Sequence, residues 1–338
     1  MLFSNIFIFD SEMQTIVYAT DLDDENVIEK KLDESTYHSL CNELSACNLS
    51  IYEKNVEILK SLDISDNIIQ SMSEDEINEM LVNAESIETK MTYYSMDENG
   101  QPTIISEDEC MEMIACYENN TLISTAENGD SNGYLVGGGC MRITITTVFL
   151  NPSSENNQKG WFFIHVWYEW LVLDSNRNLD VIFITVPNVS WDDDMTNSFS
   201  SSCFYHVTDS DGNVGNYSGG RVTGTQMKFG GPSGFGHCWN LPKDSGNSRV
   251  TYIQYYLKAK ARLQEYDHAN TYNVFAYYEH LRYSLTPVLT SDVVWTVNSK
   301  GEMSSEYVLT YTEEVTTVSD RWFILLADIY NPATLGGS

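Results

Sequence analysis

Residues Val250–Leu285 read VTYIQYYLKAKARLQEYDHANTYNVFAYYEHLRYSL, and this segment decides the fold. Its first half places Ile253, Tyr255, Leu257, Ala259, Ala261 and Leu263 on one face and Tyr256, Lys258, Lys260 and Arg262 on the other. Alternation with a period of two is typical of a strand that buries one face. The segment predicts two long strands folded back on each other through Asp267–Asn270, with shorter strands added at their edges.

Strand patterns continue through the C-terminal part of the chain. They cover residues 140–146, Trp161–Val172, Val181–Val186 and two runs between Val293 and Tyr311 that are joined through Asn298–Gly301. No helical periodicity separates these runs, which favours an antiparallel sandwich or barrel. We expect an antiparallel β-sandwich domain over residues 140–330.

The N-terminal part has the three- and four-residue apolar steps and the capping signals of helices. The expected elements within Asp21–Ser95 are helices over residues 25–44 and 52–62, a short helix capped by Ser65 and a helix behind the capping box Ser73–Glu76. A hairpin around Asp97–Gly100 and a second capping box, Ser106–Glu109, whose helix ends near Glu118, should follow.

The fold class is therefore α+β, with an acidic helical N-terminal region followed by an antiparallel β-sandwich. The predicted boundaries are a truncated signal segment at 1–19, an acidic helical region with a small hairpin at 20–118, a linker rich in Asn, Ser and Gly at 119–139 and the β-sandwich at 140–330.

Charge is strongly negative and unevenly spread. The 338 residues carry a net charge of −31, and residues 1–130 hold 29 Asp and Glu against five Lys. Phosphates and anionic lipid headgroups repel such a surface, because association with them relies on Lys and Arg replacing counterions. We therefore expect no nucleic-acid partner. Solubility explains the charge better than cation binding does.

Residues 1–19 are similar to the second half of a secretory signal. An apolar stretch from Leu2 to Phe9 precedes a more polar stretch and the small residues before the expected cleavage point at Ala19, although the basic start of such signals is missing. No later run reaches about 18 apolar residues, so no transmembrane helix is expected. The pattern predicts a secreted, extracellular protein.

Seven cysteines are too few for a small disulfide scaffold, and the absence of a C-x-x-C motif argues against zinc or thioredoxin-like chemistry. Cys41/Cys47 and Cys110/Cys116 share a six-residue spacing, which a continuous helix would not let a disulfide bridge. In an exported protein we expect Cys203 and Cys238 to form a bridge. The odd count leaves at least one thiol unbridged.

A resemblance adds to these expectations. The run LKSLDISDNIIQSMSEDEINEML (Leu59–Leu81), the following Tyr-containing strand, the Asp-Glu-Asn-Gly turn and the Ser-Glu-Asp-Glu helix resemble uncharacterised secreted proteins of Gram-positive, clostridia-like bacteria. The segments EWL (Glu169–Leu171) and YYEHL (Tyr277–Leu281) resemble their β-rich C-terminal half. This resemblance implies secretion and a helical-plus-β layout, and it implies no catalytic residues.

Two sets of residues suggest chemistry, and structural roles explain both better. His165 and Glu169 share a strand face, but their Cα atoms would lie about 13 Å apart, and a strand buried on both sides accounts for their aromatic neighbours. His237-Cys238 follows the glycine-rich run Gly230–Gly236, which lacks the Lys-Ser/Thr end of a P-loop. A Cys nucleophile needs a base that the fold places beside it, and adjacency of His237 in the sequence does not provide one. No catalytic residue is therefore assigned.

Acidic loops suggest cations with little support. Asp209–Asn213 begins like a Ca²⁺ loop, but Val214 and Gly220 stand where an EF-hand needs glycine and glutamate, so we expect a β-turn. Asp192–Asp194 could offer carboxylates, but adjacent loop acids are usually only solvated. We expect no metal and no cofactor.

Aromatic density is the remaining signal. Tyrosine and tryptophan rings on an exposed sheet surface can stack on sugar rings, and the candidates are Trp161, Trp167, Tyr256 and Tyr278. The same residues suit a sandwich core equally well.

Together these patterns predict a secreted or cell-surface binding protein without catalytic turnover, whose partner is a glycan or a cell-surface protein. The alternatives are a secreted hydrolase acting on cell-wall or glycan material and a β-type membrane-active toxin. For the toxin, the only hint is the Thr- and Ser-rich alternation of Ser304–Val318. The sequence leaves the oligomeric state open.

Overall fold

The structure is a computed structural model. The residues that it describes are 26–96, 102–126, 139–150, 160–173, 179–186, 189–192, 194–223, 228–229, 234–240, 244–263, 272–282, 293–297, 303–307 and 314–324. The predicted signal segment at 1–19 lies outside these residues.

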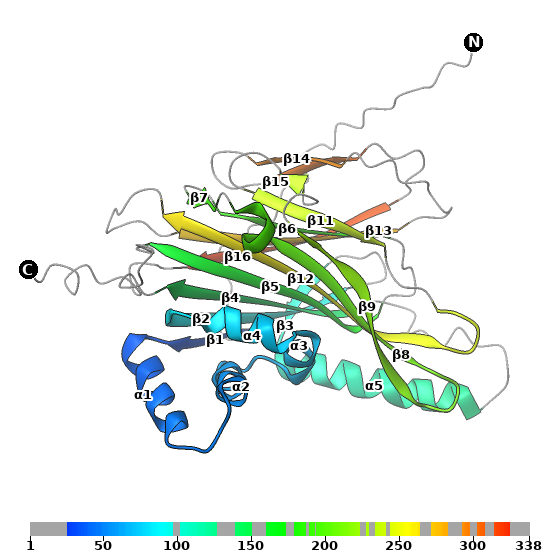
Figure 1. The fold of residues 1–338 in the computed structure, drawn as a ribbon. Coiled ribbons are helices and arrows are strands. Elements are labelled where there is room, and N and C mark those ends of the chain that lie inside the picture. Colours follow the sequence, from blue (N-terminus) through cyan, green and yellow to red (C-terminus); the bar gives the residue numbers. More distant parts are fainter. Residues whose placement is uncertain are drawn as a thin grey trace, which may run out of the picture.

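The larger of two principal sheets has nine antiparallel strands, in the order β1-β2-β4-β5-β12-β8-β9, with β3 beside β2 and β7 beside β12 (Figure 1). Its strands are β1 (Val27–Leu32), β2 (Ala84–Met96), β3 (Pro102–Ile105), β4 (Cys140–Leu150), β5 (Trp161–Val172), β7 (Val189–Trp191), β8 (Ser200–Thr208), β9 (Val214–Thr223) and β12 (Arg249–Leu263). The predicted pairing of the hairpin strands β2 and β3 is confirmed, and the predicted turn at Asp97–Gly100 lies outside the described residues.

The second sheet has five antiparallel strands in the order β10-β11-β6-β13-β16. They are β6 (Leu179–Thr185), β10 (Lys228–Phe229), β11 (Gly234–Asn240), β13 (Tyr272–Arg282) and β16 (Glu314–Ile324). The predicted pair near the C-terminus forms a small sheet of its own from β14 (Val293–Val297) and β15 (Met303–Tyr307). The described residues of the alternation in Ser304–Val318 belong to two strands in different sheets, β15 and β16, and residues 308–313 lie outside the described residues.

One hydrophobic core receives side chains from both principal sheets. Ile164, Val166 and Ile253 of the larger sheet share it with Ile182 and Ile184 of the smaller one. Two hydrogen bonds also cross between the sheets, from Tyr168 Oη to the Phe183 carbonyl at 3.0 Å and from Trp170 Nε1 to Tyr278 Oη at 2.7 Å. The expectation of a chain rich in antiparallel strands is confirmed.

The decisive segment forms both expected strands, but the expectation that they pair with each other is wrong. Strand β12 is paired by β5 on one side and by β8 and β7 on the other. Strand β13 is paired by β6 and β16 in the second sheet. Each strand has its two edges occupied, so the segment passes from one sheet to the other. Periodicity identified the strands, but it carries no information about their partners.

Helices cover the outer face of the larger sheet (Figure 1). They are α1 (Glu34–Ser45), α2 (Ile51–Ser61), α3 (Asp66–Ser71), α4 (Glu74–Leu81) and α5 (Glu107–Ala126), and a short α6 (Met195–Ser198) lies elsewhere. Side chains of α2 to α4 pack with Phe163, Trp167 and Tyr256 on this face. The predicted Ser65 cap and the capping box at Ser73 are both present.

Three expectations for the N-terminal part need correction. Residues 27–32, predicted as helix, form β1, because pairing with β2 buries Leu32. Helix α5 continues past Glu118 to Ala126, into the predicted linker. Strand β2 pairs with β4 along most of its length, so the two predicted parts share one sheet. No described helix has the length and apolarity that crossing a membrane requires.

A disulfide joins Cys110 of α5 to Cys140 at the start of β4. The predicted bridge between Cys203 and Cys238 is not formed, and that prediction is wrong. The two residues belong to different sheets, since Cys203 is buried on β8 and Cys238 lies on β11.

Candidate functional site

A cleft of about 560 Å³ lies on the outer face of the larger sheet. Its floor comes from the neighbouring strands β1, β2 and β4. Its walls come from the segment that joins the end of α2 to the start of α3 and from the start of α5. The lining residues are Ile28, Met91, Tyr93 and Arg142 on the floor and Lys60, Asp63, Ile64, Asp66 and Glu107 on the walls. The lining thus combines two cations, three carboxylates, a phenol and three apolar side chains.

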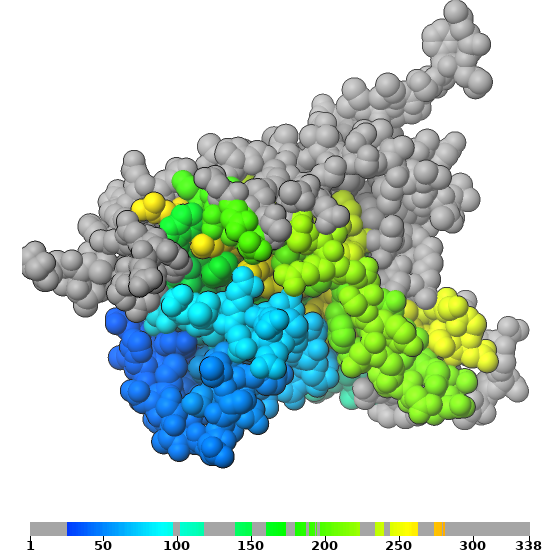
Figure 2. Space-filling model, in the orientation of Figure 1, coloured from blue at the N-terminus to red at the C-terminus, as the bar shows by residue number. Residues whose placement is uncertain are grey.

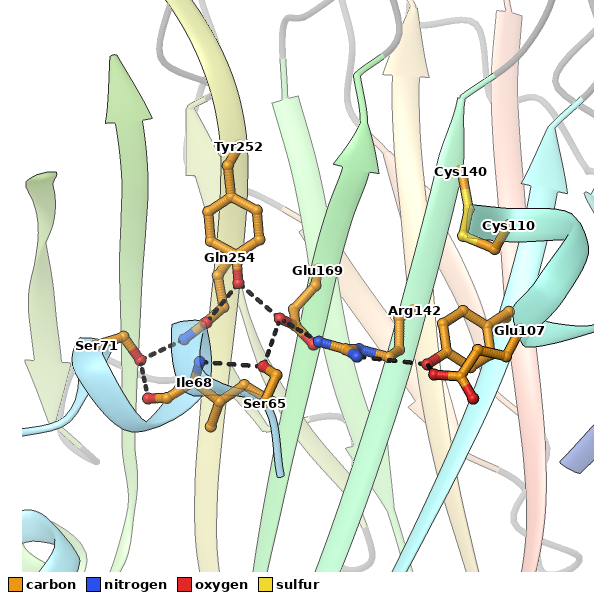
Figure 3. Close-up of polar contacts among 11 residues, drawn as sticks. Ser65, Ile68, Ser71, Glu107, Cys110, Cys140, Arg142, Glu169, Tyr252 and Gln254 are labelled. Atoms are coloured by element: carbon orange, nitrogen blue, oxygen red, sulfur yellow. Dashed lines mark hydrogen bonds and ion pairs between the residues drawn. A yellow bond between two sulfur atoms is a disulfide. The ribbon is translucent and has the colours of Figure 1, made fainter. Parts of the chain in front are cut away.

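The cleft floor belongs to a row of polar side chains that crosses the sheet. Strand register places Tyr93 opposite Arg142, Arg142 opposite Glu169, and Glu169 opposite Gln254. Cross-strand neighbours on one face of a sheet lie close enough to interact. The row therefore brings four residues from β2, β4, β5 and β12 into one connected network (Figure 3).

Glu169 is the centre of this network and is fully buried. Its carboxylate accepts hydrogen bonds from Arg142 Nε at 2.7 Å and Nη2 at 2.9 Å, a two-pronged ion pair. Ser65 Oγ donates to it at 3.3 Å. Tyr252 Oη lies 2.6 Å from Glu169 Oε1 and 2.8 Å from Gln254 Oε1, and its single proton can serve one of them at a time.

The ion pair fixes Arg142 at the cleft floor. Burial lowers the pKa of the guanidinium, whereas the charge and hydrogen bonds of Glu169 and, less strongly, Tyr93 raise it, and the net shift of the Arg142 pKa is upward. The remaining nitrogen, Nη1, lies 3.4 Å from Tyr93 Oη. Arg142 therefore stays charged and is held in one orientation toward the cleft.

Helix α3 is attached to the same row at both of its ends. Ser65 caps its first turn by accepting from the Ile68 amide while donating to Glu169. At the other end, Gln254 Nε2 donates to Ser71 Oγ at 2.6 Å. These contacts fix the wall of the cleft that carries Asp66 relative to its floor.

The opposite wall depends on the start of α5. The capping box predicted at Ser106 and Glu109 is present. Glu107 accepts a hydrogen bond from Tyr93 Oη at 2.9 Å. Burial raises the pKa of Tyr93, and the nearby Arg142 opposes that shift. One turn further, the disulfide at Cys110 ties the helix to β4.

His165 and Glu169 contact different side chains, Tyr256 and Arg142 respectively. His165 is buried under the helices, with Nδ1 2.7 Å from Tyr256 Oη. Burial, and secondarily the charge of Lys258, lowers the pKa of His165 well below its usual value. Neither residue lines the cleft, so they do not form a joint catalytic site there.

The four predicted ligand-binding aromatic residues lie in two different layers. Trp167 and Tyr256 stack on each other beneath the helices, with ring centres 5.4 Å apart. Tyr278 lies in the core between the sheets. These three rings are buried, so of the two placements that the sequence left open the structure shows the core and not an exposed sheet surface. Trp161 is half-buried beneath Lys260, whose ammonium lies 5.0 Å from its ring centre. Ligand binding by these four residues stays a prediction.

The other candidates have structural roles. Asp209 closes the turn between β8 and β9 by accepting from the Asp211 and Asn213 amides, which confirms a turn. Asp192 binds Lys260 at 2.8 Å. Cys238 lies on a strand that continues from Gly234. Across the described ranges, no group of three or more His, Cys, Asp or Glu side chains is placed to hold a metal ion.

Sequence reasoning missed the cleft itself. Arg142 alternates with apolar residues like any polar strand residue, and Glu107 looks like part of a capping box. Their meeting depends on strand order, which no local pattern records. Sequence reasoning also missed a ring pair: the half-buried Tyr205 and the exposed Tyr217 stack across β8 and β9 with ring centres 5.6 Å apart. Their equal distance from the Asp209–Asn213 turn was the available signal.

Comparisons with known proteins add little. No family model matches the chain, and no curated protein matches it. One solved structure that it resembles is described as "pH-induced modulation of Streptococcus parasanguinis adhesion by Fap1 fimbriae". The match has 11% identity, covers 53% of this chain and 78% of that chain, and has a TM-score of 0.18. A likeness at this TM-score carries no argument about fold or function.

Proposed function

We propose that the protein is a secreted or cell-surface binding protein that holds a polyhydroxylated ligand, such as a glycan segment, in the cleft on the outer face of the larger sheet. In this proposal the two principal sheets form a β-sandwich, and the acidic helices form the layer that builds the cleft walls. The observation that carries it is the fixed Arg142 guanidinium facing carboxylates across an open, mostly polar cleft.

The mixture of groups suits hydroxyl-rich ligands. A sugar hydroxyl both donates and accepts, so it can bridge a carboxylate and a cation. Glu107 and Asp66 supply acceptors, and Arg142 and Lys60 supply donors. Ile28, Ile64 and Met91 offer apolar contact for the C–H faces of a ring. The volume of about 560 Å³ lies within the range of small-molecule pockets.

Pre-organisation strengthens the case for binding. A ligand pays less for ordering side chains when the protein already holds them in place. Arg142 is fixed by Glu169, and Glu107 is fixed by Tyr93. The buried Glu169 carboxylate is fully engaged by three neighbours, which leaves it unsuited to the acid or nucleophile role of a glycosidase. Binding without turnover is therefore the favoured class.

The disulfide supports the proposal of export. Disulfides persist in oxidising compartments and are rare in reducing ones. Cys110 and Cys140 form one that anchors the cleft wall. The resemblance of Leu59–Leu81 to secreted proteins of Gram-positive bacteria agrees with it. The partner is proposed to be a glycan or a glycosylated cell-surface protein.

The test measures how much of the protein is retained on insoluble peptidoglycan, chitin and immobilised mucin, and whether soluble product is released from them. Glu107→Gln removes a charge from the cleft wall, while Asp108→Asn removes the same charge from the same exposed first turn without touching the cleft. We expect retention on at least one material, weakened by about tenfold in Glu107→Gln and unchanged in Asp108→Asn.

Two results would contradict the proposal. Equal retention of both variants would show that the ligand does not bind in the cleft. Soluble product released by the wild type would move the protein to the hydrolase class, and an accompanying loss of release in Glu107→Gln would place the reaction in the cleft.

A further inference from the structure

The two edges of the larger sheet differ in how well they are protected against pairing with another strand. At one edge, β1 is short and carries Glu29, Lys30 and Lys31. Lys30 binds Asp63 at 2.9 Å, and Glu29 binds Lys90. Short length and charged side chains are the usual protections of an edge strand. This edge is closed to new partners.

The other edge, β9, has little protection. It is ten residues long, most of it is exposed on both faces, and within the described residues its outer side has no paired strand. Its sequence, VGNYSGGRVT, has a single charge, Arg221. Val214 and Tyr217 are exposed by 60% and 49%. Figure 2 shows this strand at the molecular surface, beside the helical layer.

Backbone geometry identifies which residues of β9 point their hydrogen-bonding groups outward. The turn ends with a hydrogen bond from the Asp209 amide to the Asn213 carbonyl at 3.0 Å. In an antiparallel ladder, hydrogen-bonded pairs alternate with pairs whose N–H and C=O groups point away. The alternation therefore turns Val214, Asn216 and Ser218 toward the open edge.

We propose that β9 pairs with the β9 strand of a second copy of this chain, antiparallel and centred on Asn216, to join the two larger sheets into one. This register opposes Asn216 with its own copy and Val214 with Ser218, so all three outward-facing residues meet. It also opposes Tyr217 with the partner's Gly215, which has no side chain to collide with it, while each Tyr217 ring lies over the Gly215 of its own strand. A register centred on Tyr217 would instead set two tyrosines directly opposite each other.

Charge also favours a second copy. Arg221 at one end of β9 binds Glu76 at 2.6 Å and keeps an exposed side chain. The antiparallel arrangement brings this end toward the partner's turn, which carries Asp209 and Asp211. The central residues are uncharged, so pairing places no like charges opposite each other. Because a twofold axis relates the two copies, the contact between Arg221 and the partner's turn forms at both ends of the paired strands.

The contact is small, and the copies repel each other. A few strand residues bury less area than a permanent dimer needs, so we expect a reversible dimer with a Kd of about 10–100 µM. Each copy carries a net charge of −31. Screening of that charge by salt should strengthen the dimer, the opposite of an association driven by surface ion pairs.

Sedimentation of the full chain in a Cys47→Ser/Cys116→Ser background, which removes the two exposed thiols, tests the pairing. We expect the average mass to rise toward that of a dimer near about 0.1 mM protein and to rise further with added salt. Asn216→Pro, which removes an outward-facing N–H, should be monomeric with unchanged thermal unfolding. Gly215→Pro, on the inward-facing register, should instead destabilise the hairpin.

A cysteine at the centre gives a second readout. Opposed Cα atoms in a hydrogen-bonded antiparallel pair lie about 5.5 Å apart, within the reach of a disulfide. Asn216→Cys in the same background should therefore form a dimer on oxidation, whereas Ile51→Cys on exposed α2 should not. A wild type that stays monomeric, a dimer that survives Asn216→Pro, or equal crosslinking through both cysteines would overturn the proposal.

Discussion

Removing one member of the buried Arg142–Glu169 pair should destabilise the protein far more than removing both. Arg142→Met leaves a fully buried carboxylate with only the neutral donors Ser65 and Tyr252, and we expect this to cost about 3–5 kcal/mol. Glu169→Leu strands a guanidinium whose side chain is 12% exposed, and we expect a cost of similar size.

The double variant removes both charges, and the neighbouring hydroxyl groups keep hydrogen-bond partners. Tyr252 can still donate to Gln254 at 2.8 Å, and Ser65 still caps the Ile68 amide at 3.2 Å. The double variant should therefore cost less than the sum of the single variants, with a coupling of about 2–4 kcal/mol.

Urea unfolding followed by circular dichroism and tryptophan fluorescence measures all four free energies of the cycle. The exposed pair Lys30–Asp63, with side chains 44% and 50% exposed, is the matched control, and Lys30→Met should cost less than about 1 kcal/mol. Additive costs in the buried cycle, or a cost below about 1 kcal/mol for Arg142→Met, would refute the reasoning.

Three further predictions follow from particular contacts. Cys110→Ser opens a disulfide whose cysteines are 30 residues apart and should lower the free energy of unfolding by about 3–4 kcal/mol in urea, whereas the exposed Cys47→Ser should change it little; equal effects would contradict this. The pKa of His165 is lowered in the folded protein, whereas in the unfolded chain it is near 6.5. Just below pH 6.5 the unfolded chain therefore binds a proton at this residue while the folded ring stays neutral. The free energy of unfolding should therefore be highest above about pH 6.5 and should fall below that pH by up to about 1.4 kcal/mol per pH unit. His165→Gln should flatten that slope, and an unchanged slope would contradict the assignment to His165. Finally, Ser73→Ala should cost about 1 kcal/mol through loss of the α4 cap, and an unchanged thermal midpoint would speak against it.

Local patterns predicted elements well and their partners poorly. The bounds of Trp161–Val172 match β5, and the caps at Ser65, Ser73 and Ser106 are present, because alternation and capping act within a few residues. The long hairpin was wrong because strand pairing is decided by competition among edges across the whole chain. Residues 27–32 were predicted as helix because short apolar runs suit either structure.

The cleft was beyond sequence reasoning for the same reason. Tyr93, Arg142 and Glu107 are separated along the chain and meet only because β2 lies beside β4 and α5 follows a hairpin on β2. The disulfide could not be predicted from cysteine spacing, since Cys110 meets Cys140 through that same arrangement. The sequence left open whether the candidate aromatic residues face solvent or a core, because alternation alone does not say that helices cover the second face of β5.

Hydrogen exchange of the wild type with solubilised peptidoglycan and chitin fragments tests the binding site most directly. A ligand in the cleft should slow amide exchange at residues 60–66, which supply one wall, and at residues 106–110 around the lining residue Glu107, and should leave β9 unchanged. Glu107→Gln should lose this protection, and Asp108→Asn should keep it. Protection confined to other segments, or present equally in both variants, would contradict the assignment of the cleft as the binding site.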